Sequence, residues 1–175
     1  MRLLPALLAV ALLPGPASAA PKPYLTDPVG DTQVTGTASD DIVSLTFTTK
    51  VAKRTRYWVT TLRLAGAPMP SSTLSYEVRG TTKDGCGSFD LYARSTAEGV
   101  AYYTPCSGTP YEQPALLALT GDSLTWSVRL SGAPWKPGTE FRQVIVTVAP
   151  CDPEFGISFL GYDDASSDAP YRFGQ

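Results

Sequence analysis

The most regular feature of the sequence is an alternation of hydrophobic and polar residues with a period of two. Between residues 41 and 50, for example, Val43, Leu45 and Phe47 alternate with serine and threonine. Successive side chains of a β-strand point to opposite faces of a sheet, so this alternation predicts strands with one buried face. Turn residues between these runs predict antiparallel neighbours. We predict strands over 41–50, 55–64, 74–78, 88–95, 99–104, 115–119, 124–130, 141–149 and 157–160.

The number and length of these strands define the fold class. No helical period persists beyond about two turns anywhere in the sequence. Together with about eight or nine strands, this predicts an all-β fold, an antiparallel β-sandwich of the jelly-roll type, with a closed barrel as the less favoured alternative. The run 141–149 is rich in β-branched residues and almost continuously apolar. We therefore expect it to form a central strand that is covered on both faces.

The first 19 residues have the composition of a Sec signal peptide. A positive Arg2 precedes an apolar run over 3–13, and a Pro-Gly-Pro breaker precedes an Ala-Ser-Ala cleavage pattern. The alternative is a transmembrane anchor, but about 11 apolar residues fall short of the roughly 20 that span a bilayer. We predict a secreted protein with a signal peptide at 1–19, a single domain over 20–175 and no membrane span.

Composition excludes several classes of function. The chain contains no histidine, which removes the Ser-His-Asp and Cys-His catalytic arrangements and the common zinc motifs. Its net charge is −2, which argues against nucleic-acid binding. Glycosidase chemistry needs two carboxyl groups at a defined separation, and no pair in the sequence stands out. We therefore predict that the protein is not an enzyme, and we interpret the basic turn Lys50, Lys53, Arg54 and Arg56 as a solvated loop.

Three cysteines follow the predicted cleavage site. In an oxidising compartment, one pair is expected to form a disulfide. Cys86 and Cys106 flank the strands predicted at 88–95 and 99–104, and a hairpin of these strands would bring the two cysteines together. We predict a Cys86–Cys106 disulfide with Cys151 unpaired. The alternatives pair Cys151 with either of the other two.

An acidic turn lies close to the predicted start of the mature chain. Asp27 and Asp31 flank Gly30, which allows a sharp turn, and Asp41 begins the first long strand. Ca²⁺ binds six to eight oxygens from carboxylates, carbonyls and water, and a site made only of oxygen ligands favours calcium over zinc, copper or iron. We interpret the three aspartates as candidate calcium ligands. The alternative is an ordinary turn in which each aspartate binds its own backbone.

Three segments carry a resemblance to a known group of proteins. They are Asp-Pro-Val-Gly-Asp at 27–31 before Asp41-Ile42, the run 121–128, and the acidic closing segment 163–174. Their order resembles secreted bacterial β-sandwich modules of the DOMON and family 9 carbohydrate-binding-module-like group, especially small actinobacterial exported proteins. The resemblance implies that the first and last segments lie side by side. Asp164 or Asp168 would then complete the calcium site.

Aromatic residues are the candidates for binding a sugar ring. Tyr102-Tyr103 and Tyr57-Trp58 each place one aromatic side chain on either face of a strand, so one member of each pair points away from the core. Trp135 lies in a proline-rich loop. We select Trp58, Tyr103 and Trp135 as candidate ligand-binding residues, with packing in the core as the alternative for each.

Taken together, these patterns predict a secreted, non-catalytic β-sandwich module that calcium stabilises. We expect its partner to be a polysaccharide or a cell-envelope glycan. The alternative is a secreted protein-interaction or structural protein that has no sugar site. A hydrolase that uses carboxylates is the less favoured third possibility.

Overall fold

The structure of the protein is a computed structural model, which describes residues 20–32, 37–71, 74–93, 98–152, 156–157 and 163–174. The predicted signal peptide at 1–19 and most of the strand predicted at 157–160 lie outside the described residues. In the part of the chain that is described, no helix has the length and apolar character needed to cross a membrane.

The regular elements of the described residues are β-strands, joined by turns and by one 3₁₀ turn, η1 (Leu130–Gly132). Every strand pair is antiparallel. The strands are β1 (Leu25–Thr26), β2 (Ile42–Ala52), β3 (Thr55–Leu64), β4 (Leu74–Thr82), β5 (Ser88–Ala93), β6 (Gly99–Thr104), β7 (Tyr111–Thr120), β8 (Ser123–Arg129), β9 (Glu140–Asp152), β10 (Gly156–Ile157), β11 (Asp163–Ser167) and β12 (Tyr171–Arg172).

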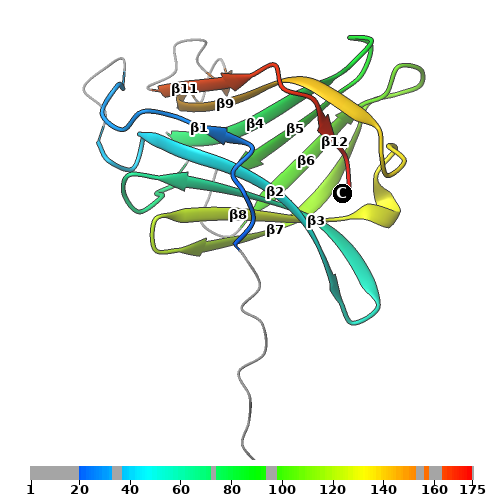
Figure 1. The fold of residues 1–175 in the computed structure, drawn as a ribbon, viewed down its shortest axis with the longest axis horizontal. Coiled ribbons are helices and arrows are strands. Elements are labelled where there is room, and N and C mark those ends of the chain that lie inside the picture. The colour runs from blue at the N-terminus through cyan, green and yellow to red at the C-terminus, as the bar shows by residue number, and fades with distance from the viewer. Residues whose placement is uncertain are drawn as a thin grey trace, which may run out of the picture.

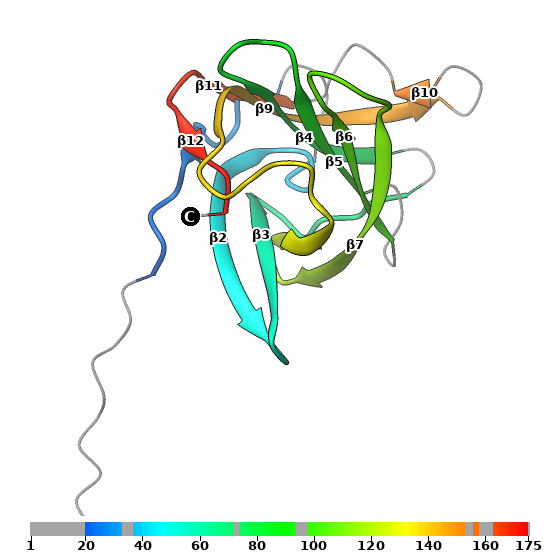
Figure 2. The same ribbon diagram turned by 90° about the vertical axis from the view of Figure 1, so that its right-hand side faces the viewer.

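These strands form one continuous sheet, which curls strongly into a half-barrel (Figures 1 and 2). The hydrogen-bonded order is β1-β2-β3-β8-β7-β6-β5-β4-β9-β10, and β11 and β12 also pair with β9. The prediction of an all-β antiparallel fold is confirmed. The jelly-roll sandwich expected from the sequence divides its strands between two sheets, whereas the ladders described here connect all of them.

Strand β7 is the reason that the sheet is continuous. Its first half, from Tyr111 to Ala115, pairs with β6, and its second half, from Leu116 to Thr120, pairs with β8. One long strand therefore serves two neighbours and joins the strands on either side into a single curled surface. Alternation in the sequence predicts that residues 115–119 form a strand, but it carries no information about this change of partner.

The core fills the inside of the curl. Alternate apolar residues of β5 and β8 point into it, including Phe89, Leu91, Leu124 and Trp126, each with no exposed surface. Strand β9 follows the same rule on one face only. Its valines at 144, 146 and 148 are fully buried, but Ile145 between them is 39% exposed. The expectation that this strand is covered on both faces is therefore wrong, because β9 lies in a single layer whose outer face meets solvent.

The two borders of the curled sheet meet along a seam, where β1 and β2 lie next to β11 (Figure 1). The Ile42 amide donates to Asp163 Oδ2 at 2.6 Å, and the Tyr24 hydroxyl donates to the Ala169 carbonyl. The Phe47 and Tyr171 rings stack with centroids 4.1 Å apart. The first and last described segments therefore lie side by side, and side chains rather than a backbone ladder hold them together.

The predicted disulfide is present. Cys86, which precedes β5, is bonded to Cys106, which follows β6, and their Cα atoms are 4.7 Å apart. The β5–β6 hairpin supplies this proximity, as expected from the sequence. Cys151 lies in β9, but its side chain is outside the described residues, so the prediction that it is unpaired stays a prediction.

Candidate functional site

An acidic cluster lies on the seam. It consists of Asp27, which follows β1, Asp31 in the next turn, and Asp163, the first residue of β11. Each offers a carboxylate oxygen, and these oxygens all lie within 4.8 Å of one another. Asp163 is buried, Asp27 is partly buried and Asp31 is exposed. The cluster therefore opens to solvent on the Asp31 side.

The acidic turn owes its shape to Gly30 and to Asp41. Gly30 has a φ of +91°, in the left-handed region that glycine adopts without steric cost. Its amide donates to Asp41 Oδ2 at 2.8 Å, and the Asp27 amide donates to the Val43 carbonyl at 3.0 Å. Asp41 is buried at 5% exposure, so it holds the turn in place from the start of β2.

Asp163 reaches the cluster through the register of β11. Side chains alternate along this strand, so Asp163 and Ala165 face inward while Asp164 and Ser166 are exposed. The Asp163 carboxylate also accepts the Ile42 amide, which ties β11 to β2. The C-terminal segment thus contributes one specific carboxylate, and its position is fixed from both sides of the seam.

Three ionised carboxylates without a counter-ion are electrostatically unfavourable in this cluster. Burial raises the pKa of Asp27 to about 6, with further contributions from Asp31, Asp163 and Asp41. The pKa of Asp163 is also raised, first by burial, although the Ile42 amide opposes the shift. Asp27 Oδ2 and Asp41 Oδ1 are buried without a hydrogen-bond partner among the described residues. A bound proton or a bound cation would therefore stabilise the cluster.

The predicted metal ligands divide into two groups. Asp27 and Asp31 belong to the cluster, and Asp41 supports it through Gly30. Asp164 and Asp168 are exposed and do not belong to it. Asp163, which does, was missed because the sequence shows two adjacent acids and does not show which of them faces inward.

The predicted sugar-binding aromatics lie mainly in the core. Trp58 and Tyr103 have no exposed surface, so neither ring presents a face to a ligand. Their neighbours Tyr57 and Tyr102 take the outward positions. Trp135 differs, because it is partly exposed and lines a pocket of about 610 Å³ together with Thr82, Lys83, Asp84, Cys106, Thr139 and Glu140.

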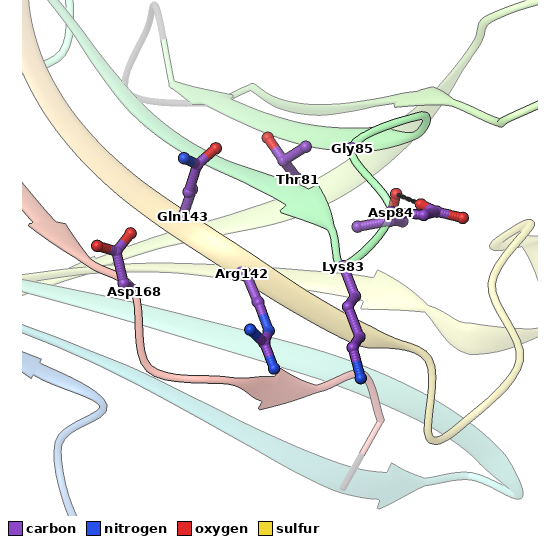
Figure 3. Close-up of a pocket in the computed structure, with 8 residues that line it drawn as sticks. Thr81, Lys83, Asp84, Gly85, Arg142, Gln143 and Asp168 are labelled. Carbon is purple, nitrogen blue, oxygen red and sulfur yellow. Dashed lines mark hydrogen bonds between the residues drawn. The ribbon is translucent and has the colours of Figure 1, made fainter.

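A second pocket of about 400 Å³ adjoins the first at Thr82, Lys83 and Asp84. We call the two together the Trp135 groove. Figure 3 shows the far part of this groove, where Arg142, Gln143 and Asp168 lie near the beginning of β9. The groove thus combines one aromatic ring with hydroxyl, amide, acidic and basic side chains.

Two backbone positions, one behind the Trp135 ring and one in the groove itself, have constraints of their own. A Cβ atom on Gly87 would lie 2.4 Å from the Trp135 ring, so only glycine leaves room for that ring. Gln143 has a φ of 50°, uncommon for a residue with a side chain, where β9 bulges opposite Gly80. Such bulges redirect side chains and are frequent beside binding sites.

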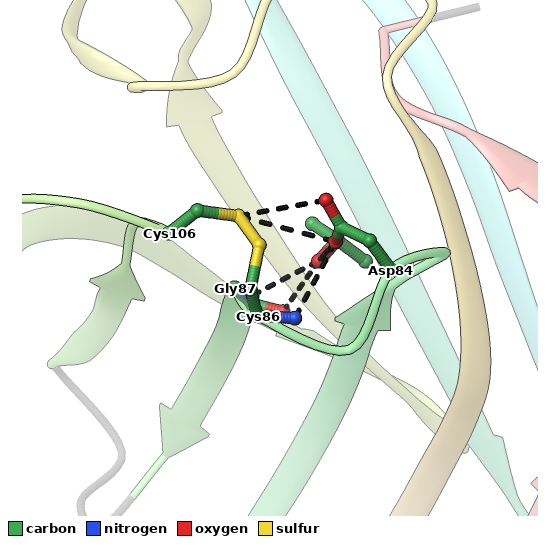
Figure 4. The surroundings of a disulfide bond; sticks show 5 residues. Asp84, Cys86, Gly87 and Cys106 are labelled. Carbon is green, nitrogen blue, oxygen red and sulfur yellow. Dashed lines mark hydrogen bonds between the residues drawn. A yellow bond between two sulfur atoms is a disulfide. The ribbon is translucent and has the colours of Figure 1, made fainter.

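The charges of the Trp135 groove are largely compensated. Arg142 Nη2 lies 3.1 Å from Glu140 Oε1, and Lys83 Nζ lies 4.0 Å from the same oxygen. Asp84 accepts the Thr82 hydroxyl at 2.6 Å and faces the disulfide, with both carboxylate oxygens 3.9 Å from Cys106 Sγ (Figure 4). Because both nearby sulfurs are in a disulfide, Asp84 and these cysteines do not form a metal site.

Comparisons with known proteins return no match: no protein-family model, no curated protein and no solved structure is similar to this chain. The resemblance to the DOMON and family 9 carbohydrate-binding-module-like group therefore stays a prediction made from short motifs.

Proposed function

We propose that the protein is a secreted, non-catalytic binding module whose seam is closed by Ca²⁺ in the acidic cluster. The observation that carries this proposal is the convergence of Asp27, Asp31 and Asp163 from the two ends of the chain. A cation there would neutralise the mutual repulsion of these carboxylates and would join β11 to the N-terminal turn. The disulfide supports secretion, because disulfides persist in oxidising compartments.

Calcium is the cation that the donor set favours. The cluster offers carboxylate oxygens and no nitrogen or free sulfur. Three side chains fall short of the six to eight oxygens that Ca²⁺ prefers, and the exposed side at Asp31 leaves room for water to supply the rest. Many extracellular calcium sites of this open kind bind in the range of about 10⁻⁴ to 10⁻³ M.

The test compares two aspartates that differ in their relation to the cluster. Calcium that binds only the folded state should raise the unfolding free energy by about 2.7 kcal/mol when its concentration is 100 times the Kd. We expect Asp31→Asn to abolish most of this gain, because it removes an exposed ligand whose side chain makes no hydrogen bond to another described residue. Asp164→Asn, an equal change of charge on the outward face of β11, should retain it. The measurement is the Tm in calcium and in EDTA, together with calorimetric titration of Ca²⁺. An unchanged wild-type Tm would leave the cluster as an ordinary acidic turn.

We further propose that the Trp135 groove binds a carbohydrate, such as a polysaccharide or a cell-envelope glycan. An aromatic ring flanked by several hydrogen-bonding side chains in a concave surface suits the alternating apolar faces and hydroxyl edges of a sugar. Asp84, Gln143 and Asp168 provide polar groups along the groove. The supporting observation is the bulge that directs Gln143, since a left-handed backbone at this position lowers stability.

A glycan-array screen with and without EDTA tests the carbohydrate proposal separately from the calcium proposal. We expect binding that persists in EDTA, because none of the three cluster aspartates lines the Trp135 groove. Gln143→Gly should weaken binding about tenfold, the loss expected for one hydrogen bond of roughly 1.4 kcal/mol, while leaving the Tm unchanged or higher. A wild-type protein that retains no glycan would favour the alternative, a module that binds another protein.

A further inference from the structure

The turn of the β2–β3 hairpin carries a basic surface that the proposed function does not use. Lys50, Lys53, Arg54 and Arg56 are four of the 14 Lys and Arg residues, in a protein whose net charge is −2. Arg56 donates to the Gly174 carbonyl at 2.9 Å. The other three are exposed, and none forms an ion pair among the described residues.

The turn projects from the curled sheet. The β3–β8 ladder ends where Tyr57 pairs with Arg129, and β1 reaches only Ser44 and Leu45 of β2 in the described chain. Beyond these points, the two arms of the hairpin pair only with each other. Figures 1 and 2 both show its end extending away from the body. Val51, which lies in this end, is 72% exposed.

The two basic residues at the tip of this turn have a backbone conformation that is unfavourable for residues with side chains. Ala52 pairs with Thr55, so Lys53 and Arg54 form a two-residue loop, with φ values of 48° and 66°. Positive φ at both positions defines a type I′ turn, for which Asn-Gly is strongly preferred. Lysine and arginine in this backbone lower the stability of the hairpin. Two strained cations at the tip of a projecting hairpin indicate that their charge serves binding.

The basic surface continues onto the outward face of the sheet. Lys50 pairs with Tyr57, which pairs in turn with Arg129, so these three side chains form one row across three strands. The row faces outward, since the next residue of β3, Trp58, is fully buried in the core. Val51, the neighbour of Lys50, points to the opposite face of the hairpin and lies next to the charged tip. Basic residues beside an aromatic ring and an exposed aliphatic side chain are typical of segments that bind the interface of a bilayer.

We propose that this hairpin binds the surface of an anionic lipid bilayer. The tip would enter the headgroup layer end-on, with Lys53 and Arg54 against the phosphates and Val51 beside them, while Lys50 and Arg129 on the outward face would add to the electrostatic attraction. Each basic residue at an anionic surface strengthens binding by about fivefold. A dissolved polyanion would meet the same charges, but it would leave the exposed Val51 without a role.

Sedimentation with vesicles tests the proposal on the full protein. We expect binding to vesicles that contain about one-third phosphatidylglycerol, weak binding to pure phosphatidylcholine, and a steep loss with salt. Lys53→Asn with Arg54→Gly should weaken binding about 25-fold while raising the Tm, because it installs the preferred turn and removes two charges. The control, Lys22→Gln with Lys136→Gln, removes two exposed cations from other segments and should change binding by much less.

A tryptophan at the tip distinguishes a bilayer from a soluble polyanion. In Val51→Trp, anionic vesicles should shift the fluorescence emission to the blue, whereas dextran sulfate should not. Equal binding to both kinds of vesicle, or full binding by the Asn-Gly variant, would overturn the proposal. A blue shift with dextran sulfate, or binding to vesicles without any shift, would overturn the bilayer in favour of a polyanion.

Discussion

At the scale of the residue, Asp27 combines a buried, unpaired carboxylate oxygen with a raised pKa. Its Oδ2 atom is buried without a hydrogen-bond partner among the described residues, and burial and the neighbouring carboxylates raise its pKa to about 6. The folded state therefore holds a proton on Asp27 more tightly than the unfolded chain does. The stability that this proton provides is fully present below the ordinary pKa of 3.8 and is lost as the pH rises through about 6.

We predict that Asp27→Asn changes stability in a pH-dependent way when calcium is absent. In EDTA at about pH 7.5, the variant should be more stable than the wild type by on the order of 1 kcal/mol, a small value because Asp27 is partly exposed and solvent screens it. At about pH 4, where the wild type is protonated, the two should converge. The measurement is the Tm of both proteins across this range. In calcium the order should reverse, because the variant has lost a ligand. A constant difference between the two proteins in EDTA would contradict the pKa argument.

Adjacent residues show how far the sequence predicts this site. The sequence identified pairs of chemically similar neighbours, such as Asp163-Asp164 and Tyr57-Trp58, and in each pair the chosen member lies on the other face of its strand. Asp163 faces the cluster, and Trp58 fills the core. A shift of one residue in register exchanges the two faces. The residue types were therefore predictable, whereas the selection between neighbours required the strand pairing.

At the scale of the element, close packing inside the curl determines where a strand must carry glycine. Strand β4 passes beneath the Phe89 ring at Gly80, where a Cβ atom would lie 2.2 Å from Phe89 Cε1. The ring is fully buried and packs edge-to-face on Trp58 and Phe141, with centroids 4.8 Å and 5.0 Å away. A methyl group at this position must therefore displace the aromatic core or bend the strand.

We predict that Gly80→Ala destabilises the protein by about 1–3 kcal/mol, the usual effect of overpacking a core. Gly132→Ala is the matched control. Its added Cβ would meet the end of the Gln113 side chain, and the residue is exposed, so the change should stay within about 0.5 kcal/mol. Urea unfolding of the three proteins measures both values. Equal stability of Gly80→Ala and the wild type would show that the Phe89 ring has another position available.

Elements were predictable where alternation alone determines them. Strand β3 coincides with the predicted range 55–64, and β2 and β9 continue past the C-terminal ends of their predicted ranges by two and three residues. The bounds of β7 were less predictable, because the strand begins at Tyr111 and contains Pro114, a residue that interrupts strand patterns. Pro114 lies just before the change of partner from β6 to β8. There the missing amide of proline is compatible with a ladder that is passing from one neighbour to the next.

At the scale of the whole molecule, the all-β class followed from the sequence, and the single curled sheet did not. Two packed sheets and one curled sheet bury the same alternating residues, so their patterns are equivalent until the partners of each strand are known. The disulfide was predictable because it closes a local hairpin. The seam was not predictable from periodicity, since it joins the two ends of the chain through side chains of residues such as Asp163 and Tyr24.

The seam gives the folded protein a preferred line of local opening. Elsewhere in the described sheet, separating neighbouring strands breaks a backbone ladder, whereas parting the N-terminal segment from β11 breaks a few side-chain contacts. Fluctuations of the native state should therefore concentrate there, with a smaller free energy than global unfolding. Such an opening would expose the stacked rings of Phe47 and Tyr171 while the disulfide-linked β5–β6 hairpin on the other side stays intact. The molecule would thus open and close along this seam, and the segments that separate would be the one that carries β1 and the one that carries β11.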